Sequence, residues 1–288
     1  MLVVRTVAEL CEEMARREGP IGLVPTMGAL HAGHLALVER AKDECETVVM
    51  SIFVNPAQFN DARDLATYPR DEERDLETAA EAGVDVVFLP DPVEMYPRGY
   101  ATNIVVSGPV AETLEGAKRG RSHFDGVATV VAKLMIASAA DAAYFGQKDA
   151  QQIIVVQRMV TDLGLPVRVV ACPIVRDADG LALSSRNVHL SDEERARALA
   201  IPRSLNAIAD AVAGGEIDAR TLAARALDVL AEAEVLVEYI AFVDPDSLEP
   251  VDEIEREVLV AFAGSVGTTR LLDNIVIGPG SGTGEKSR

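Results

Sequence analysis

The sequence lacks any apolar run long enough to cross a membrane, and it is also poor in cysteine and in positive charge. Its more apolar segments, such as 127–140, are interrupted by Lys133 and by small polar residues, whereas a spanning helix needs about 18 consecutive apolar residues. Near the N-terminus, Arg5 is followed by acidic residues where a signal peptide would continue its apolar segment. These absences predict a cytoplasmic chain with no membrane partner.

Cysteine is scarce as well as scattered. Cys11, Cys45 and Cys172 form no CxxC pair, and they do not combine with histidine at a spacing typical of zinc sites. An odd number of widely separated thiols predicts reduced, buried side chains rather than a disulfide framework. The sequence therefore indicates no disulfide scaffold, and it leaves the protein ligands of any metal unknown.

Positive charge is outnumbered throughout the chain. Lys and Arg total 27 against 46 Asp and Glu, which gives a net charge of -19, divided as -9 over residues 1–175 and -10 over 176–288. A nucleic-acid-binding protein presents a basic face to phosphates, so this balance argues against DNA or RNA as the main partner. A local basic pocket for a small anion remains compatible with it. One hypothesis for the acidity is a salt-rich or crowded cytoplasm.

What the chain does contain is enough apolar sequence for a substantial core, with 49% hydrophobic residues in a length of 288. Residues 1–175 alternate β-branched apolar runs with amphipathic helical patterns. The predicted strands are 21–25, 47–54, 84–89, 141–146 and 167–172, and the predicted helices are 34–45, 71–82, 124–139 and 149–163. Such alternation predicts a Rossmann-like, doubly wound parallel sheet with helices on both faces. Ligands bind such sheets beyond the carboxyl ends of the strands, so motifs that directly follow a strand are candidates for the functional site.

From residue 176 the pattern changes to that of a smaller α+β domain. Ser191 and Glu194 form a capping box, and Pro202 should kink or divide the helix that follows. A helix is predicted at 218–232, with strands at 235–243, 256–263 and 268–277 and a hairpin around 264–267. We expect this domain to act as a lid, with a mobile tail from about residue 278.

The first candidate site is the segment 25–34, PTMGALHAGH, between a strand and a helix. His31 and His34 are three residues apart and can face the same way, while the helix N-terminus offers unpaired N–H groups and the positive end of its dipole. Gly33 would let a ligand approach the backbone. Together these features predict a site for nucleotide phosphates; the alternative is two surface histidines beside a tight turn.

Two further motifs follow predicted strands. In FVNPAQF, Asn55 and Gln58 can both donate and accept hydrogen bonds, so they could read a small polar substrate, although Asn-Pro is also a simple turn former. In FGQKDAQQ, Lys148 could contact phosphate, Asp149 could accept from ribose hydroxyls or merely cap a helix, and Gln152 lies one helical turn further on.

Basic and hydroxyl side chains gather in two more loops. Residues 183–187, LSSRN, place two hydroxyls beside a guanidinium, which suits phosphate contacts from a loop that could close over a nucleotide. Residues 116–124, GAKRGRSHF, hold three cations within four residues and suggest an anion-facing loop, or else a solvated loop before a helix.

The fragments PTMGALHAGH, FVNPAQF, YPRD, HFDGVATVV, FGQKDAQQ and LSSRN, taken in this order, closely resemble the pantoate–β-alanine ligase family within the HxGH nucleotidyltransferase superfamily. The resemblance extends from about residue 19 to about residue 277. It implies a Rossmann-like first domain, a smaller second domain and a homodimer formed through the first. It also implies ATP, D-pantoate and β-alanine as substrates with Mg²⁺, condensed through a pantoyl adenylate with release of AMP and pyrophosphate.

The resemblance also assigns roles to individual residues. It implies His34 as proton donor, with His31, Lys148 and Arg186 as further catalytic residues. Gln58 and Gln152 would bind pantoate, and Gln58 would also lie near β-alanine. The implied ATP-binding residues are Met27, Gly28, Ala29, Leu30, His31, Ala32, Gly33, His34, Gly146, Gln147, Lys148, Asp149, Val175, Leu183, Ser184, Ser185 and Arg186.

The chain departs from the family pattern at two places. Where the family often has Arg-Pro-x-His-Phe, this chain reads RGRSHF, so either Arg119 or Arg121 could take the role of the family arginine. Leu183 replaces the commoner Met, an exchange of similar size and polarity. Two other functions stay open from the sequence: an HxGH adenylyltransferase acting on a phosphorylated acceptor, and a nucleotide-binding regulatory module without catalysis.

Overall fold

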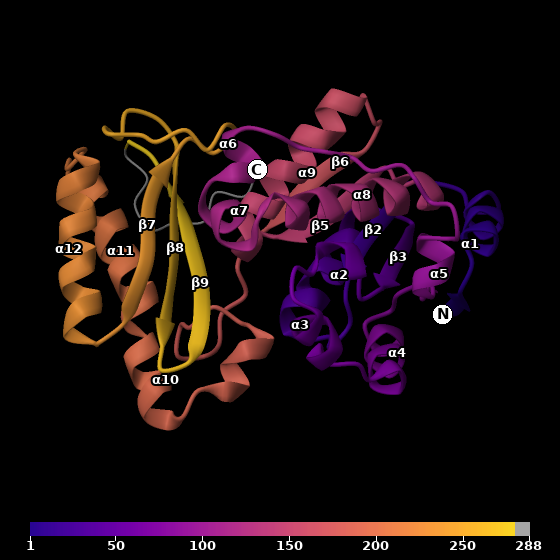
Figure 1. Cartoon of the computed structure of the whole chain (residues 1–288), viewed down its shortest axis with the longest axis horizontal. Helices are drawn as coiled ribbons and strands as arrows, with labels where there is room; N and C mark the ends of the chain where they lie inside the picture. Colours follow the sequence, from indigo (N-terminus) through magenta and orange to yellow (C-terminus); the bar gives the residue numbers. More distant parts are fainter. Residues whose placement is uncertain (280–288) are drawn as a thin grey trace. The chain divides into compact units, whose positions relative to one another are not determined.

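The computed structural model describes residues 1–279, and the chain divides into two compact units, 1–172 and 173 onward (Figure 1). The sequence placed this boundary at residue 175. The parallel strands all lie in the first unit, and the predicted antiparallel strands all lie in the second. The predicted mobile tail, apart from residues 278 and 279, lies outside the described residues.

The first unit is built on a six-stranded parallel sheet, as predicted, with the order β1-β4-β3-β2-β5-β6. The strands are β1 (Leu2–Val4), β2 (Ile21–Thr26), β3 (Thr47–Ile52), β4 (Val86–Phe88), β5 (Ala142–Gly146) and β6 (Arg168–Cys172). From β2 the chain winds outward through β3 to β4, and later strands occupy the other side of β2. The β2/β5 neighbours therefore form the point where the winding reverses, which is where such sheets bind ligands.

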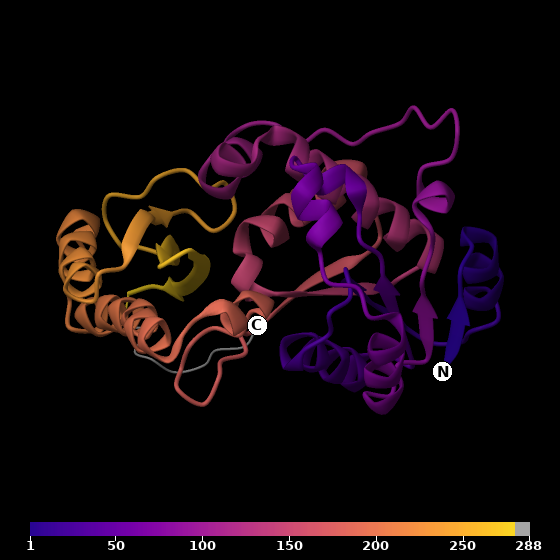
Figure 2. The same ribbon diagram turned by 60° about the horizontal axis from the view of Figure 1, so that its bottom comes forward.

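Helices cover both faces of this sheet (Figure 2). On one face, α2 (Ala32–Glu44) and α4 (Glu72–Glu81) contribute Leu37, Val38 and Ala79 to a core shared with alternate strand residues such as Val24 and Met50. On the other face lie α1 (Val7–Met14), α8 (Arg121–Ser138) and α9 (Ala150–Leu163), which pack against one another or against the strands. Both faces of the central strands β2, β3, β4 and β5 are buried, as their nearly continuous apolar sequences require, whereas the edge strands β1 and β6 expose some of their residues.

Several short elements of the first unit were not expected from the sequence. They are the edge strand β1, helix α1 and the short helices η1 (Pro56–Gln58), α3 (Ala62–Thr67), α5 (Pro92–Met95), α6 (Pro109–Glu112), α7 (Leu114–Arg119) and η2 (Gln147–Asp149). Most of them are too short to give a readable hydrophobic period. The expectation that 55–70 is a plain loop is wrong, since it contains η1 and α3.

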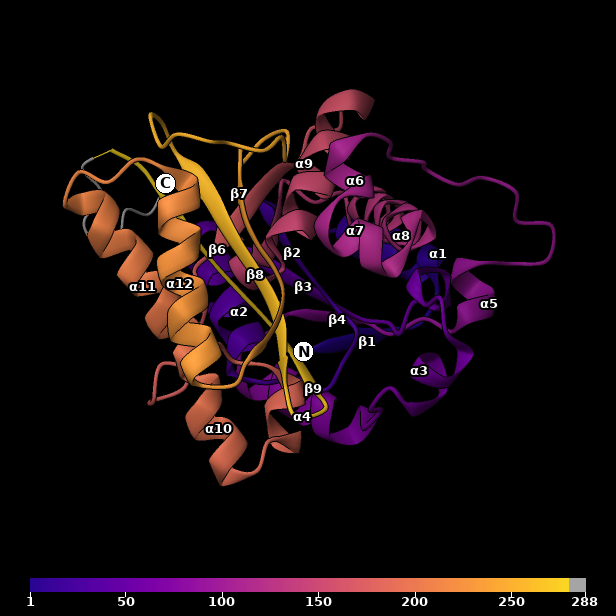
Figure 3. The same ribbon diagram turned by 60° about the vertical axis from the view of Figure 1, so that its left-hand side comes forward.

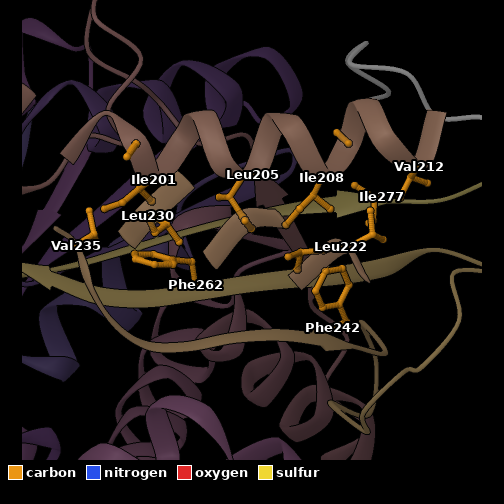
Figure 4. Close-up of a cluster of buried hydrophobic side chains, with 14 of the residues drawn as sticks. Ile201, Leu205, Ile208, Val212, Leu222, Leu230, Val235, Phe242, Phe262 and Ile277 are labelled. Atoms are coloured by element: carbon orange, nitrogen blue, oxygen red, sulfur yellow. The ribbon is translucent and has the colours of Figure 1, made fainter. Parts of the chain in front are cut away.

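The second unit packs helices on a three-stranded antiparallel sheet of order β7-β8-β9 (Figure 3). Its elements are η3 (Ser185–His189), α10 (Asp192–Ala198), α11 (Ala200–Ala213), α12 (Ala219–Glu232), β7 (Leu236–Val243), β8 (Val258–Val266) and β9 (Thr269–Ile277). Figure 4 shows Ile201, Leu205 and Ile208 of α11 directed toward Phe262 and Ile277 of the sheet. These side chains are buried and form the core of this unit.

Two sequence predictions for this unit meet different outcomes. Helices α10 and α11 are divided at Leu199, just before Pro202, as predicted. The hairpin is tighter than expected, because Val266 pairs directly with Thr269 and the turn holds only Gly267 and the residue after it. Gly264 instead lies inside β8, where an added Cβ would come within 2.7 Å of the Leu236 carbonyl oxygen.

The cysteines are all free, and none of the described helices is long and apolar enough to cross a membrane. Cys172 is buried and Cys45 is half-buried, but Cys11 is exposed. The prediction that all three thiols are buried is therefore wrong for Cys11. The Sγ of Cys11 lies 3.5 Å from the Ala137 carbonyl oxygen of α8, so this thiol touches the neighbouring helix at the margin of the core while the residue stays largely exposed.

Candidate active site

The turn that follows β2 is held in shape by a buried carboxylate from α4. Asp75, which is 3% exposed, accepts hydrogen bonds from the backbone N–H groups of Ala29 (2.9 Å) and Leu30 (2.8 Å). Gly28 and Ala29 both have positive φ, of 81° and 51°. A Cβ on Gly28 would come within 2.6 Å of the Asp75 carboxylate, so this turn needs glycine there for both reasons.

His31 and His34 form a reciprocal cap on the N-terminus of α2. The Gly33 N–H donates to Nδ1 of His31 (3.1 Å), and the His31 N–H donates to Nδ1 of His34 (3.3 Å). Because Nδ1 accepts in both rings, each neutral imidazole carries its proton on Nε2. The rings lie 4.1 Å apart, centroid to centroid.

The histidine cap changes the role expected of the helix N-terminus. The sequence predicted unpaired backbone N–H groups there, but those of Gly33, His34 and Leu35 are already bonded to His31. Gly33 also has a different neighbour from the one expected, since an added Cβ would lie 2.8 Å from Cε1 of His31. With these three backbone groups capped, the Nε2–H groups of the two imidazoles are donors that the turn can offer to a ligand.

Both histidines are held neutral. Burial, and to a lesser extent the neighbouring His31, lower the pKa of His34 to about 3. The pKa of His31 is also lowered by burial and by the charge of Lys148. A ring that is neutral at pH 7 offers its Nε2–H as a hydrogen-bond donor. The implied role of His34 as proton donor stays a prediction.

The β5–α9 junction brings charge to the same edge of the sheet. Lys148 and Asp149, in η2 directly after β5, both act electrostatically on His31 and His34. Asp149 precedes α9, but its side chain makes no capping hydrogen bond, so the alternative that it is only a helix cap finds no support. Gly146, Gln147 and Gln152 belong to the same junction and are half-buried.

Gln58 lies beside the turn that follows β2 and links it to the end of β3. Its Nε2 donates to Sδ of Met27 (3.1 Å), its Oε1 accepts from Asn55 (3.0 Å), and its backbone carbonyl accepts from Nδ1 of His123 (2.7 Å). Asn55 is only 1% exposed. The expectation that Asn55 reads a substrate directly is therefore wrong, because its amide is used within the protein.

The implied ATP-binding residues after 172 belong to the second unit and form a hairpin there. The Leu183 N–H donates to the Val175 carbonyl (2.9 Å), and Ser184 Oγ accepts from the Arg186 N–H (3.3 Å). Ser185 and Arg186 are exposed at the start of η3. The hairpin is anchored by Arg176, which binds the buried carboxylate of Asp273 through two hydrogen bonds of 2.7 and 2.9 Å.

The basic segment 116–124 lies in α7 and in the start of α8, joined at Gly120, so the expectation of a loop there is wrong. The segment is also less cationic than its sequence suggests. The Arg119 guanidinium pairs with Glu115 of the same helix (2.9 Å), which is largely buried. An arginine neutralised in this way is a weaker candidate for an anion contact than an unpaired one. For the family arginine, Arg121 therefore stays the other possibility.

Three residues that shape this site received no functional role from the sequence: Asp75, His123 and Tyr96. Asp75 sits among Glu72, Glu73 and other charges that look like a solvated helix face. The available signal was its spacing of four from Ala79, which is also buried, since residues at i and i+4 share a helix face. His123 begins the fragment HFDGVATVV that carries part of the family resemblance, and Tyr96 lies in a segment for which no element was predicted.

The assembled site offers two neutral imidazole donors, one lysine and an amide at the edge where the sheet reverses. Imidazole N–H groups and an ammonium suit a polyphosphate, and the neutral amide of Gln58 suits a polar acceptor. Among residues 1–279, no group of three or more His, Cys, Asp or Glu side chains could hold a metal ion. The arrangement therefore favours phosphate chemistry that works by positioning and charge stabilisation.

Comparison with known proteins identifies relatives over nearly the whole chain. The family model described as pantoate-beta-alanine ligase matches residues 2–276. A pantothenate synthetase of Cereibacter sphaeroides is 50% identical over 278 residues, covering 96% of this chain and 99% of that protein. A pantothenate synthetase of Roseiflexus sp. is 50% identical over 279 residues with the same coverage.

Solved structures agree with these sequence relatives. The crystal structure of pantothenate synthetase from Thermus thermophilus superposes with a TM-score of 0.91 at 48% identity, covering 97% of this chain and all of that one. A pantoate-beta-alanine ligase from Francisella tularensis, complexed with β,γ-ATP and β-alanine, gives a TM-score of 0.78 at 31% identity, covering 96% and 97% of the two chains.

Proposed function

The chain belongs to the pantoate–β-alanine ligase family, and from this premise we propose how its own residues divide the work of the reaction. The enzyme is an AMP-forming acid–amine ligase that condenses D-pantoate with β-alanine at the expense of ATP. The observation that carries the assignment of roles is the meeting of the histidine pair, Lys148 and Gln58 at the carboxyl edge of the sheet.

ATP binds along the β2/β5 edge in this proposal. The turn from Met27 to His34 and the junction from Gly146 to Asp149 flank the phosphates, and Lys148 supplies a positive charge. Val175 and the segment from Leu183 to Arg186 would contribute from the second unit, with the adenine at the backbone of Val175. Their exposed hydroxyl and guanidinium groups suit phosphate contacts. The lid role of that unit stays a prediction.

Adenylation requires a pantoate carboxylate oxygen to attack the α-phosphorus while pyrophosphate departs. Gln58 and Gln152 hold the hydroxy acid without neutralising its carboxylate, which therefore stays nucleophilic. His31 and His34 donate from Nε2 to the phosphate oxygens on which charge develops, and Lys148 and Arg186 stabilise the leaving pyrophosphate. In this scheme His34 stabilises charge and transfers no proton.

The second step joins β-alanine to the activated acid. The amine attacks the acyl carbon of the pantoyl adenylate, the bond to the phosphate oxygen breaks, and AMP leaves. We place β-alanine beside Gln58, so that this side chain lies between the positions proposed for pantoate and for the amine. No protein nucleophile takes part in either step.

Mg²⁺ would enter with ATP as part of the substrate. This ion usually keeps several waters and is bound by substrate phosphates with one or two carboxylates, rather than by a cage of protein ligands. The site fits that mode, because Asp149 is an exposed carboxylate beside Lys148 and the histidines. When bound, the ion would neutralise phosphate charge.

Two further assignments extend the proposal. We infer a homodimer formed through the first unit, for which light scattering would give a mass about twice the 30.7 kDa of one chain. We also infer that the enzyme works in the cytoplasm, which cell fractionation would test. A monomer in solution would contradict the first inference.

The adenylyltransferase that uses a phosphorylated acceptor fits the site less well. Such an acceptor would require cations near Gln58, whereas the side-chain amide of Gln58 contacts Asn55 and Met27. The backbone carbonyl of Gln58 contacts His123, whose pKa is lowered by burial. A regulatory module without catalysis would not need Lys148 beside two neutral imidazoles. Neither alternative is favoured by an observation of its own.

The decisive assay is the exchange of labelled pyrophosphate into ATP. We expect exchange that depends on pantoate and proceeds without β-alanine, because the adenylate forms before the amine reacts. Absence of pantoate-dependent exchange would contradict the adenylate route.

The roles of single residues are tested in the same assay. We expect His34→Ala and Lys148→Ala each to slow exchange by about 100-fold or more, the usual cost of losing a group that stabilises transition-state charge. Lys42→Ala removes a lysine from the far end of α2 and should leave exchange unchanged. Near-normal exchange in either site variant, with an unchanged melting temperature, would rule out its assigned role.

A further inference from the structure

Asn55 lies between the protein core and Gln58, the residue proposed to bind pantoate, and its side chain is fully hydrogen-bonded. Asn55 makes four side-chain hydrogen bonds, which is the full capacity of an amide. Its Oδ1 accepts from the Ala57 N–H (3.2 Å) and the Tyr96 hydroxyl (2.6 Å). Its Nδ2 donates to the Gly126 carbonyl (3.1 Å) and to Oε1 of Gln58 (3.0 Å).

The orientation of the Asn55 amide follows from its backbone partners. The Ala57 N–H can only donate, so Oδ1 must face it, and the Gly126 carbonyl can only accept, so Nδ2 must face that side. The two remaining positions are then determined. The Tyr96 hydroxyl must donate to Oδ1, and Gln58 must offer an oxygen to Nδ2.

This arrangement determines which end of the Gln58 amide is left for a substrate. Because Oε1 is turned toward Asn55, the two protons of Nε2 point the other way, toward Met27, whose sulfur is a weak acceptor. Gln58 therefore meets its ligand as a donor. A flipped amide would place two NH₂ groups, those of Asn55 and Gln58, against each other.

Tyr96 is well placed to hold this orientation. Its ring packs edge-on against Tyr100 (5.0 Å between centroids) and lies 6.4 Å from the ring of Phe53, while the Lys133 ammonium lies 5.5 Å from its centroid. Burial raises the pKa of the phenol, so the hydroxyl stays protonated and remains a donor. The segment around Gly126 is equally constrained, since an added Cβ there would come within 2.4 Å of the Ala57 carbonyl oxygen.

We propose that Tyr96 is a positioning residue for the acid substrate: through Asn55 it holds the amide of Gln58 with Nε2 facing the ligand, so that the site selects an acid bearing a hydrogen-bond acceptor at that position. The inference rests on the proposed role of Gln58 in binding pantoate. Tyr96 itself need not touch any substrate, and it lies 38 residues beyond Gln58 in the sequence.

The first test compares two tyrosine variants in the full enzyme. Tyr96→Phe keeps the ring and removes the donor to Asn55, so we expect the KM for pantoate to rise about threefold to tenfold, the usual effect of one hydrogen bond. The KM for ATP should stay constant. Tyr100→Phe is the matched control, because the Tyr100 ring packs in the same cluster and makes no hydrogen bond to Asn55.

A double-mutant cycle shows whether Tyr96 acts through Gln58. In a Gln58→Ala background the orientation of the amide no longer exists, so we expect Tyr96→Phe to leave the already raised KM for pantoate unchanged. Additive effects of the two substitutions would overturn the proposal, because Tyr96 would then act by another route. A parallel rise in the KM for ATP and for pantoate would overturn it too, since it would indicate a general structural role.

The cycle also separates this inference from the proposed function. If Gln58→Ala leaves the KM for pantoate unchanged, the assignment of Gln58 to pantoate fails, and the present inference falls with it. If Gln58→Ala raises that KM and Tyr96→Phe does not, only the positioning role of Tyr96 fails. Thermal melting of each variant ensures that the kinetic values refer to folded protein.

Discussion

At the scale of single residues, each histidine of the motif serves two purposes with different atoms of the same ring. Nδ1 of each ring completes the cap of α2, and only Nε2 remains for a ligand. The cap consequently orients both donors before any substrate arrives. A motif of two histidines and a glycine is thus a structural unit as well as a set of ligands, and its parts cannot be replaced independently.

Gly33→Ala tests this dependence. The new Cβ would lie 2.8 Å from the His31 ring, which must then move out of its capping position. Because misplacement of a catalytic group by about 1 Å can cost roughly 100-fold in rate, we expect pantoate-dependent exchange to fall by about that factor. Gly214→Ala, at φ -78° with its nearest neighbour 3.3 Å away, is the control and should keep the wild-type rate. Full activity of Gly33→Ala would show that the ring position is not critical.

The pH dependence of stability should report the neutral state of His34. In the unfolded chain a histidine titrates near pH 6.5, whereas the folded-state pKa of His34 is lowered to about 3. Between these values the unfolded state binds the extra proton, so stability is complete above pH 6.5 and is lost as the pH falls toward 3. We expect His34→Gln to weaken the loss of stability between pH 7.5 and 5 in urea titrations. The same loss in wild type and variant would contradict the depressed pKa, and His189→Gln, which removes an exposed histidine, serves as the control.

At the scale of elements, α4 supports a turn that is remote in sequence. Asp75 lies one turn into this helix and accepts hydrogen bonds from two backbone N–H groups of the turn at 28–30. The neighbouring Asp71 performs a purely local task, because it caps the same helix by accepting from the Arg74 N–H. One helix therefore carries two aspartates, four residues apart, with separable functions.

Asp75→Asn should affect ATP binding as well as stability. An asparagine offers one oxygen and one NH₂ group, so one of the two buried N–H groups would lose its acceptor, at a cost of about 1–3 kcal/mol in unfolding free energy. We expect a rise of about tenfold in the KM for ATP, because the turn loses its shape. Asp71→Ala should cost about 1 kcal/mol through the lost cap and leave the KM for ATP unchanged. Equal effects of the two variants on that KM would refute the special role of Asp75.

Periodicity and turn chemistry were sufficient to predict the central strands, the long helices and the division at Leu199. They failed for η1, α3 and the short helices before α8, since such elements owe their shape to the neighbours they pack on. The candidate site shows the same contrast between local and long-range signals. The histidines, Lys148 and Gln58 were predicted from local motifs. Asp75 and Tyr96 were not, because their partners lie 46 and 41 residues away and only the folded chain brings them together.

At the scale of the whole molecule, the net charge of -19 coexists with a site for anionic substrates. Cations such as Lys148 and Arg186 fall at the loops assigned to phosphate, while most acidic side chains face solvent. The excess negative charge then belongs to the outer surface, where it favours solubility and disfavours compactness through self-repulsion. The distance over which this repulsion acts depends on the salt concentration, since the Debye length falls from about 10 Å at 0.1 M to about 3 Å at 1 M.

We therefore expect added salt to stabilise the fold. The melting temperature should rise as sodium chloride increases from about 0.1 M to 1 M, because screening weakens the repulsion among surface carboxylates. A double variant, Asp228→Lys with Glu249→Lys, removes exposed negative charge and should respond less. A melting temperature and an activity that are both indifferent to salt would argue against adaptation of this surface to a salt-rich interior.

The bond between Asp75 and the turn that follows β2 also has a consequence for the order of folding. The turn at 28–30 cannot be held in its final form until α4, 45 residues later in the chain, has docked beside β3. Contacts between such distant residues form late, after the entropy of closing the intervening loop has been overcome. During synthesis, the growing chain would thus pair β2 with β3, whose partners lie 26 residues apart, before this turn takes its final form. The turn would still be complete before β2 pairs with β5, whose residues follow later in the chain.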